Sequence, residues 1–190
     1  MEEQLSKKIY RQLQTDILSR TIDERTILTE NELAQKYNVS KAPVRDALHL
    51  LCAQGYLISY PRKGYLIRIY SNAEIRKIQQ VRSHIERLSV MLAIQNASDD
   101  QINSLREYLK PQEPEIDPEK TYNYLFHLRL GEISGNEYVP AVLRELIHKI
   151  CIAWIDSRYD IDSHRAIIDA LLERNEQKAL DALEYDLNHA

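Results

Sequence analysis

Three basic side chains recur at four-residue steps in the segment SKAPVRDALHLL, residues 40–51: Lys41, Arg45 and His49. Four residues is close to one turn of an α-helix, so these side chains would share one face. Cationic side chains on an exposed helix face suit phosphate groups, and an arginine can also bind O6 and N7 of a guanine through two hydrogen bonds. This face therefore indicates nucleic-acid binding. A basic stripe can also be only the solvated face of an amphipathic helix, so the surrounding elements must decide.

The apolar residues of the same segment predict how its helix packs. A stripe at positions i, i+3, i+4 and i+7 would pack against neighbouring helices and leave the basic face outward. Its members are Val44, Ala47, Leu48 and Leu51. Pro43 falls at the third helical position, where its missing N–H would have no helical partner in any case. Ser40 is placed to cap this helix, and the free N–H groups of a helix start favour a phosphate.

Two shorter patterns predict the helices that precede this segment. Ile9, Leu13 and Ile17 recur every four residues, which indicates an amphipathic helix. Thr29 and Glu32 form the capping-box pattern T-x-x-E, which marks the start of a second, short helix. We therefore expect a helical support against which the apolar stripe of the basic helix packs.

A hairpin with a cationic tip is predicted after the basic helix. Alternating apolar residues at 56–60 and 65–70 flank the turn PRKG and indicate two short strands. The turn carries Arg62, Lys63 and Gly64, which are two cations and a flexible residue. Helix, short helix, turn, helix and hairpin is the order of a winged helix-turn-helix, whose recognition helix enters the major groove. This order favours DNA binding over the interpretation as a solvated face.

Beyond Tyr70 the chain is predicted to be helical. Ser71 with Glu74, and Ser98 with Gln101, form two more capping boxes that would start helices. The expected helical segments are 71–96, 98–110, 118–134, 137–158, 161–174 and 176–189. The predicted fold is therefore mainly α. It has a winged helix-turn-helix domain of three helices and a β-hairpin at 1–70, and an all-helical bundle of about six helices at 71–190.

Charge divides the chain near the same position. Residues 1–69 contain 11 Lys and Arg against 8 Asp and Glu, whereas residues 70–190 contain 14 against 21, and the whole chain carries a formal charge of −4. A mildly basic first third on an acidic remainder suggests two units with different partners. No apolar run approaches the roughly 18 residues of a membrane span, and the beginning MEEQLSKKIYRQ has no apolar signal core. We therefore expect a cytoplasmic protein with no membrane partner.

The motif LTENELAQKYNVSKAPVRDALHLLCAQGYL, followed by the wing PRKGYLI, resembles the N-terminal domain of GntR-family bacterial transcription regulators. The resemblance covers residues from about 7 to 69. Taken with the basic stripe and the wing tip, it implies DNA contacts from Asn31, Ser40, Lys41, Ala42, Arg45, His49, Arg62, Lys63 and Gly64. Lys41 stands where the family commonly has an arginine, which keeps the charge but loses the two-pronged donor group.

The helical half resembles the effector-binding FCD domain of the FadR-like branch, in its shorter VanR-like form. The motifs are VRSHIERLSVMLA at 81–93 and NYLFHLRLGEISGN at 123–136, and residues 163–187 are similar to the closing pair of helices. The resemblance implies a ligand-responsive transcription regulator, commonly a repressor, that dimerises largely through these helices. One winged domain reads few base pairs, so we expect a homodimer on a pseudo-palindromic operator of double-stranded DNA.

Many FCD domains hold a divalent metal on one Asp and three His beside the effector pocket, and this chain matches that pattern in part. His127 and His164 match, Asn123 stands at the position of the Asp, and Asp186 falls at the last position, with His189 one helical turn later as the alternative. The resemblance therefore implies one Zn, Ni or Mn ion. A neutral Asn should hold it more weakly than a carboxylate. The alternative is that the two histidines line a solvated cavity without an ion.

The same cluster is expected to bind the effector. The effector-binding residues implied are Arg82, Asn123, His127 and His164. A guanidinium in this cavity would pair with a small organic acid. Alternatively, Arg82 would form an ion pair with Glu86, four residues further on.

Two other functions compete with this interpretation. A cavity filled by side chains such as Tyr122, Tyr124 and Trp154 would leave a constitutive DNA-binding regulator without a ligand. A water activated by a metal on the histidine cluster would make the domain an enzyme. The sequence shows no nucleophile elbow, phosphate loop or paired catalytic carboxylates, so we expect a regulator and not an enzyme.

Overall fold

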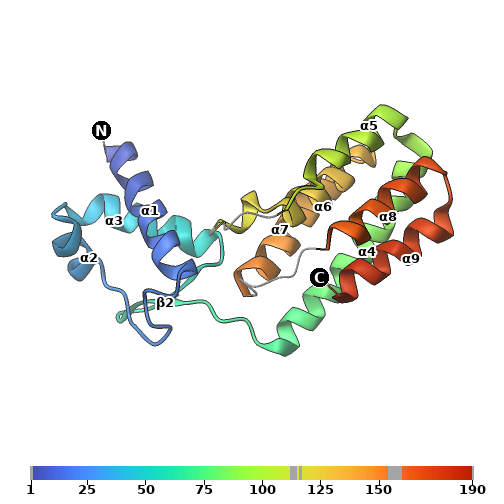
Figure 1. The fold of residues 1–190 in the computed structure, drawn as a ribbon. Helices are drawn as coiled ribbons and strands as arrows, with labels where there is room; N and C mark the ends of the chain where they lie inside the picture. The colour runs from blue at the N-terminus through green and yellow to red at the C-terminus, as the bar shows by residue number, and fades with distance from the viewer. Residues whose placement is uncertain (1, 112–114, 116, 154–159, 190) are drawn as a thin grey trace. The chain divides into compact units, whose positions relative to one another are not determined.

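The computed structural model describes residues 2–111, 115, 117–153 and 160–189. The chain divides into two compact units, residues 1–70 and 71–190 (Figure 1). Within the described residues there are nine α-helices and one two-stranded antiparallel sheet, which follows the third helix. The predicted fold class is confirmed: a winged helix-turn-helix precedes an all-helical unit. No helix in these ranges is both long and apolar enough to cross a membrane.

Three helices build the core of the first unit. They are α1 (Glu2–Leu18), α2 (Glu30–Tyr37) and α3 (Lys41–Ala53). The predicted apolar stripe of α3 is buried, and it packs mainly against α1, whose Ile9 and Leu13 are also buried. Because the stripe fixes one side of α3 in the core, the opposite side of the helix is left at the surface.

The connection between α2 and α3 is tight. Asn38 ends α2 in the left-handed backbone conformation, with φ of 52°, a region that Asn tolerates better than most residues. Pro43 lies in the first turn of α3, as its position in the sequence predicts, and it is also buried. The expected cap is absent, because the Ser40 hydroxyl makes no capping hydrogen bond although Ser40 is the N-cap residue. Ser40 therefore begins the helix through its backbone conformation.

The predicted caps of the other helices differ in detail. Thr29 Oγ1 accepts a hydrogen bond from the Glu32 amide at 3.2 Å and donates one to Glu32 Oε2 at 2.7 Å. The return contact of this box thus goes to the hydroxyl and not to the backbone amide. The capping boxes at Ser71 and Ser98 are both complete, as predicted.

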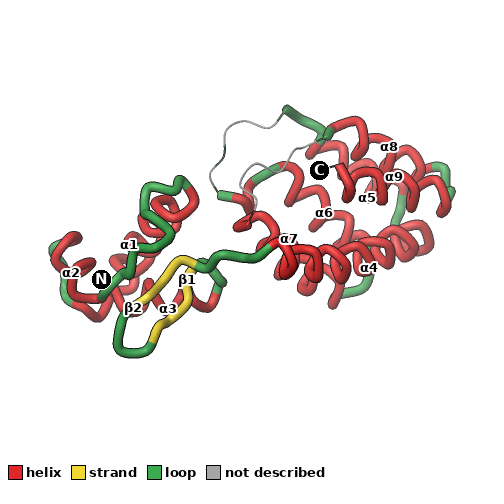
Figure 2. The backbone as a smooth tube through the Cα atoms, turned by 90° about the horizontal axis from the view of Figure 1, so that it is seen from below, coloured by secondary structure: helices red, strands yellow, loops and turns green. Residues whose placement is uncertain are grey.

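The hairpin consists of β1 (Leu57–Tyr60) and β2 (Gly64–Ile67), which pair antiparallel with Tyr60 opposite Gly64 (Figure 2). A further bridge joins β2 to the segment before α2, because the amides and carbonyls of Leu28 and Tyr65 exchange hydrogen bonds of 2.8 and 2.9 Å. The wing is therefore tied directly to the start of α2.

Six α-helices lie in the part of the second unit that the structure describes. They are α4 (Asn72–Asn96), α5 (Asp99–Ser104), α6 (Tyr122–Ile133), α7 (Tyr138–Ala153), α8 (Ile161–Leu172) and α9 (Glu176–His189). Two expected helices are shorter: α5 passes into a 3₁₀ helix at Leu105–Tyr108, and α6 begins only at Tyr122, where Thr121 caps it. The end of the segment predicted at 137–158 lies outside the described residues. Helices α8 and α9 lie side by side (Figure 1).

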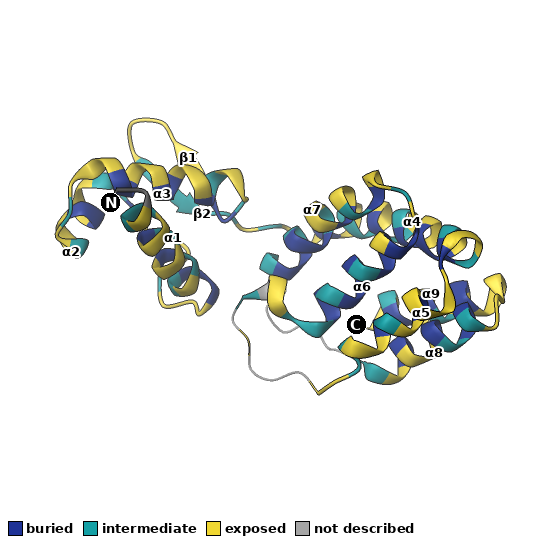
Figure 3. Cartoon of the chain, turned by 90° about the horizontal axis from the view of Figure 1, so that it is seen from above, coloured by how far each residue is buried: buried dark blue, intermediate teal, exposed yellow. Residues whose placement is uncertain are grey.

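Helix α6 is the central helix of this unit. Eleven of its twelve residues are buried or half-buried (Figure 3), and it packs against α4 and α7. A helix that is buried on nearly all sides is normally apolar throughout. Asn123 and His127 break that rule on α6. A buried polar group needs a partner, so these two residues point to a site.

Candidate nucleic-acid interface and candidate metal centre

The outer face of α3 presents the basic residues found in the sequence. Lys41, Ala42, Arg45 and His49 are all exposed, whereas Pro43 and the apolar stripe between them are buried. Asn31 on α2 and Ser40 before α3 are also exposed. Hence the structure leaves every residue predicted on these two helices accessible to a partner.

The wing tip keeps its two cations at the surface. Arg62 and Lys63 are exposed, and the Lys63 ammonium lies 5.0 Å from the centre of the Tyr60 ring, a cation–π contact that limits its motion. Gly64 has a φ of +133°, and a Cβ on it would lie 2.4 Å from the Leu28 carbonyl oxygen. Only glycine fits this position, because the bridge to Leu28 brings the two backbones together.

Arg45 has a partner that the basic pattern did not predict. Its Nε donates to Glu30 Oε1 at 3.0 Å and its Nη2 donates to Glu30 Oε2 at 2.7 Å. The hydrogen bonds from Arg45 hold the pKa of the Glu30 carboxyl below its ordinary value, and the charges of His49 and Lys41 act in the same sense. A carboxylate therefore lies within the basic face. One sequence signal points to it, namely an acidic residue at the start of α2.

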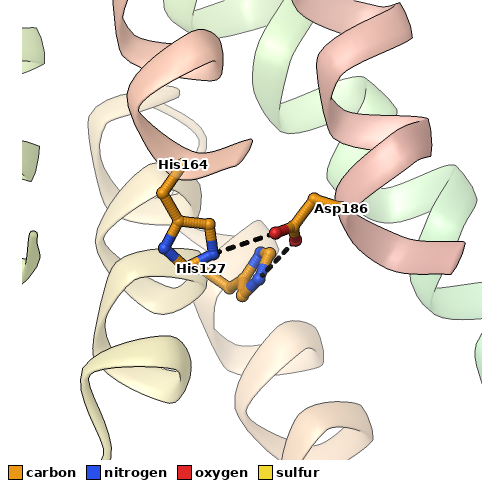
Figure 4. Close-up of side chains that lie close together, drawn as sticks. All are labelled: His127, His164 and Asp186. Carbon is orange, nitrogen blue, oxygen red and sulfur yellow. Dashed lines mark ion pairs between the residues drawn. The ribbon is translucent and has the colours of Figure 1, made fainter. Parts of the chain in front are cut away.

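In the second unit, three buried side chains from three helices converge. His127 of α6, His164 of α8 and Asp186 of α9 each offer one ligand atom, and these atoms lie within 4.8 Å of one another. Asp186 Oδ2 lies 3.2 Å from His127 Nε2, and Asp186 Oδ1 lies 3.3 Å from His164 Nε2 (Figure 4). Both imidazoles therefore turn the same nitrogen toward one carboxylate, as a shared metal would require.

Neighbouring side chains fix this group. The Phe126 ring stacks on His164 with 3.7 Å between ring centres and 8° between planes. Ser163 Oγ donates to Asp186 Oδ1 at 2.5 Å. Because these contacts hold His164 and Asp186 in place, the cluster is preorganised.

Glu86 of α4 completes the cluster on its other side. Its Oε2 lies 2.5 Å from His127 Nδ1, and its Oε1 accepts from Arg82 Nε at 2.5 Å; all three side chains are buried. Of the two partners considered for Arg82, the structure therefore gives Glu86. The sequence offered Glu86 only as that partner, and its contact with His127 was missed because it joins helices 41 residues apart.

The charges in the cluster alternate. Burial opposes ionisation of Glu86, but the charges of Arg82 and His127 outweigh it and hold the pKa of Glu86 below its ordinary value. Burial likewise opposes protonation of His127, whose pKa is nevertheless raised by Glu86 and Asp186. Burial opposes ionisation of Asp186, but the two imidazoles that face it hold its pKa below its ordinary value. The two carboxylates on either side of His127 thus favour its protonated form against the effect of burial.

The other predicted residues lie in different surroundings. Asn123 is buried one turn before His127, and its Oδ1 has no hydrogen-bond partner among the residues that the structure describes. His189 is exposed, its Nδ1 lies 2.8 Å from the Tyr185 carbonyl oxygen, and it is not in the three-residue group. The structure thus brings Asp186, and not its alternative, to the two histidines. Tyr124 is buried and Tyr122 is half-buried, whereas Trp154 lies outside the described residues.

Comparison with known proteins assigns both units. Residues 5–67 match the family model described as bacterial regulatory proteins, gntR family, and residues 77–189 match the FCD domain. The chain is 30% identical over 165 residues to the Nta operon transcriptional regulator of Aminobacter aminovorans, covering 80% of this chain and 76% of that protein. It is 28% identical over 195 residues to the uncharacterized HTH-type transcriptional regulator YdhC of Bacillus subtilis, covering 96% and 87%.

A solved structure agrees with this fold. Escherichia coli McbR/YncC superimposes with a TM-score of 0.67 at 17% sequence identity, over 97% of this chain and 93% of that chain. At this identity the likeness supports the arrangement of helices and hairpin only.

Proposed function

The chain belongs to the bacterial regulatory proteins of the gntR family, with an FCD domain as its second unit, and from this we propose that it is a sequence-specific DNA-binding repressor whose operator binding responds to a small molecule. Its relatives are transcriptional regulators, which supports a regulator over an enzyme. The six α-helices found among the described residues of the second unit support the short, VanR-like form of the FadR-like branch.

The exposed basic face of α3 is the observation that carries the DNA-binding proposal. Lys41, Arg45 and His49 lie outward on a helix whose other side is buried. Arg45 is the residue suited to a guanine edge in the major groove. Lys41 at the helix start and the two cations of the wing tip suit phosphates, which position the protein without reading sequence.

Replacement of Arg45 by Ala tests this proposal. We expect operator affinity to fall by roughly ten- to a hundredfold, the range for loss of one two-pronged base contact, with no change in folding because Arg45 is exposed. The measurement is fluorescence anisotropy with a duplex that the wild-type protein has selected from a random pool. The matched control is Arg165→Ala, an exposed arginine of the other unit with the same change in charge. Unchanged operator affinity in Arg45→Ala would refute this role.

We also propose that His127, His164 and Asp186 hold one divalent ion. Their ligand atoms are close, buried and held by neighbours, and imidazole with one carboxylate suits Zn, Ni or Mn. Asn123 Oδ1, buried one turn away without a hydrogen-bond partner in the described chain, is an added candidate oxygen. Relative to the family pattern the carboxylate has moved from position 123 to position 186, so the set keeps one acid. When bound, the ion would supply a Lewis-acidic position for an anionic effector.

Metal content tests the ion site directly. We expect the protein, purified without an affinity tag, to take up about one equivalent of Zn, Ni or Mn, and His127→Ala to lose it, as measured by elemental analysis after dialysis against each metal. His189→Ala is the control, because His189 lies outside the cluster. Wild-type protein that takes up none of the three metals would exclude the site.

A carboxylate effector is proposed from the same cluster. Arg82 uses Nε for Glu86, and its Nη2 is buried without a hydrogen-bond partner among the described residues. A buried donor without a partner costs free energy, which an acidic ligand would recover. A thermal-shift series with small mono- and dicarboxylates tests this class, because a ligand that binds only the folded state raises Tm.

A homodimer is proposed from an apolar stripe on α4. Val81, Leu88 and Met91 are 50%, 39% and 37% exposed, and their spacing of seven and three residues places them on one face of the helix. Exposed apolar residues that gather on one face mark contact surfaces. A second copy of the chain, related by a two-fold axis, would bury this stripe against itself.

A further inference from the structure

Glu30 of α2 places a carboxylate against the basic face of α3, and the geometry of its contact with Arg45 is specific. Glu30 meets Arg45 through both of its oxygens, which accept from Nε at 3.0 Å and from Nη2 at 2.7 Å. Two parallel hydrogen bonds fix the plane of a guanidinium as well as its position. Arg45 is therefore oriented before any DNA arrives.

This pairing leaves the other edge of the guanidinium for a second partner. A guanidinium has five N–H donors in one plane. The contact with Glu30 uses the side edge, formed by Nε and one N–H of Nη2. The end edge, formed by Nη1 and the second N–H of Nη2, is the pair of parallel donors that matches O6 and N7 of guanine. Glu30 thus occupies the edge that guanine does not need.

The position of Glu30 is itself fixed. It is the first residue of α2, directly after the capping Thr29, and the preceding Leu28 is bridged to Tyr65 of the wing. The Glu30 side chain is 24% exposed and that of Arg45 is 52% exposed. The Glu30 carboxylate is therefore less exposed than the Arg45 guanidinium. This is the arrangement expected if Glu30 holds Arg45 in place while Arg45 faces a partner.

A carboxylate at this place is unfavourable for general DNA affinity. It reduces the positive charge of the face, and phosphate binding depends on that charge. The nearness of Lys41 and His49, whose charges help to lower the pKa of Glu30, means that Glu30 also weakens their attraction for phosphate. Such a group is expected where discrimination against wrong sites matters more than affinity.

We propose that Glu30 is a specificity-determining residue, which holds Arg45 side-on so that its end edge reads a guanine, and which lowers binding to DNA of other sequence. This inference rests on the proposed DNA-binding function. Glu30 acts through Arg45 and is a positioning residue; its effect is on the ratio of specific to non-specific affinity.

Replacement of Glu30 by Gln tests the proposal in the full-length protein. The probes are the duplex selected by the wild-type protein, the same duplex with its guanines changed one at a time, and a scrambled duplex. We expect the ratio of selected to scrambled affinity to fall about tenfold, within the range for one two-pronged base contact. For wild-type protein, replacing the guanine read by Arg45 should lower the affinity for the duplex. We expect the Glu30→Gln variant to lose most of this difference in affinity.

The matched control is Glu32→Gln. Glu32 lies two residues further on α2, is exposed, and contacts Thr29, so this variant makes the same change in charge at the same helix start without touching Arg45. Thermal melting of both variants checks the fold. A ratio that changes equally in Glu30→Gln and Glu32→Gln would show a charge effect only and would overturn the proposal.

A double variant separates the remaining outcomes. If Glu30 acts through Arg45, Glu30→Gln should leave the ratio unchanged in the Arg45→Ala background, and an equal fall in both backgrounds would overturn the proposal. A rise in the ratio in Glu30→Gln would mean that the carboxylate competes with DNA, and this too would overturn it. Wild-type protein that selects no duplex from the pool would instead refute the proposed function itself.

Discussion

Glu86 and His127 illustrate how a single buried hydrogen bond decides which nitrogen an imidazole presents. Glu86 Oε2 lies 2.5 Å from His127 Nδ1, so that Nδ1 carries the hydrogen and Nε2 faces Asp186. Carboxylates that orient a ligand histidine in this way commonly increase its affinity for metal. Arg82 on the second oxygen of Glu86 balances the charge. In the proposed metal site, Glu86 would therefore raise metal affinity by orienting His127, without being a ligand itself.

Replacement of Glu86 by Gln should lower the affinity for Zn by about ten- to a hundredfold, the usual effect of removing such a partner. Competition with a chromophoric chelator measures this. Because the variant leaves the Arg82 charge buried without its ion-pair partner, the double variant Arg82→Gln/Glu86→Gln is measured beside it. Glu132→Gln, an exposed acid on the same helix as His127, is the control. Zn affinity equal to wild type in both Glu86 variants would contradict the role.

At the scale of elements, the wing depends on one backbone position. Gly64 begins β2 with a φ of +133° and lies against the Leu28 carbonyl, so the hairpin, the bridge to Leu28 and the start of α2 share one constraint. Backbone strain at Gly64 would therefore disturb both the wing and Glu30, the partner of Arg45 at the start of α2. The backbone conformation at Gly64 therefore constrains both the wing and the start of α2, which carries Glu30.

Replacement of Gly64 by Ala should destabilise the first unit by about 1–3 kcal/mol, the usual cost of such backbone strain, and should weaken operator binding. Thermal melting and anisotropy measure the two effects. Lys63→Ala at the same tip is the comparison, because it removes a cation without strain and should weaken binding with Tm unchanged. If Gly64→Ala melts like wild type, the close contact with Leu28 does not limit this position.

Periodicity and capping patterns predicted most of the elements, because they are local. The stripe of α3, the capping boxes at Ser71 and Ser98, and the hairpin turn each depend on residues a few positions apart. The 3₁₀ turn that ends α5 was missed, because helix propensity alone does not mark where packing shortens a helix. Residue types at family positions led to His127, His164 and Asp186. The pairing of Arg82 with Glu86 was among the sequence-based alternatives, but the contacts of Arg45 with Glu30 and of His127 with Glu86 were missed, because each joins separate helices and no local pattern encodes it.

At the scale of the molecule, the two units differ in net charge and each has its own core. The first unit carries the basic face and the second carries the acidic remainder of the chain. An effector in the second unit can change DNA binding only if it favours one arrangement of the two DNA-binding domains over another. In the proposed homodimer, the apolar stripe of α4 would hold the two copies of the chain together so that such a change of arrangement could occur.

Replacement of Leu88 by Glu tests that requirement. A charge in the centre of the stripe Val81, Leu88 and Met91 would be buried without a partner in a dimer but solvated in a monomer. We therefore expect the dissociation constant of the dimer, measured by sedimentation velocity, to rise at least tenfold. Operator affinity should fall with it, because two half-sites are then bound independently. Arg76→Gln, on another face of α4, makes the same change in net charge and should remain dimeric. A Leu88→Glu protein that stays dimeric and folded would place the dimer contact elsewhere, whereas a monomer that keeps full operator affinity would break the link between dimerisation and DNA recognition.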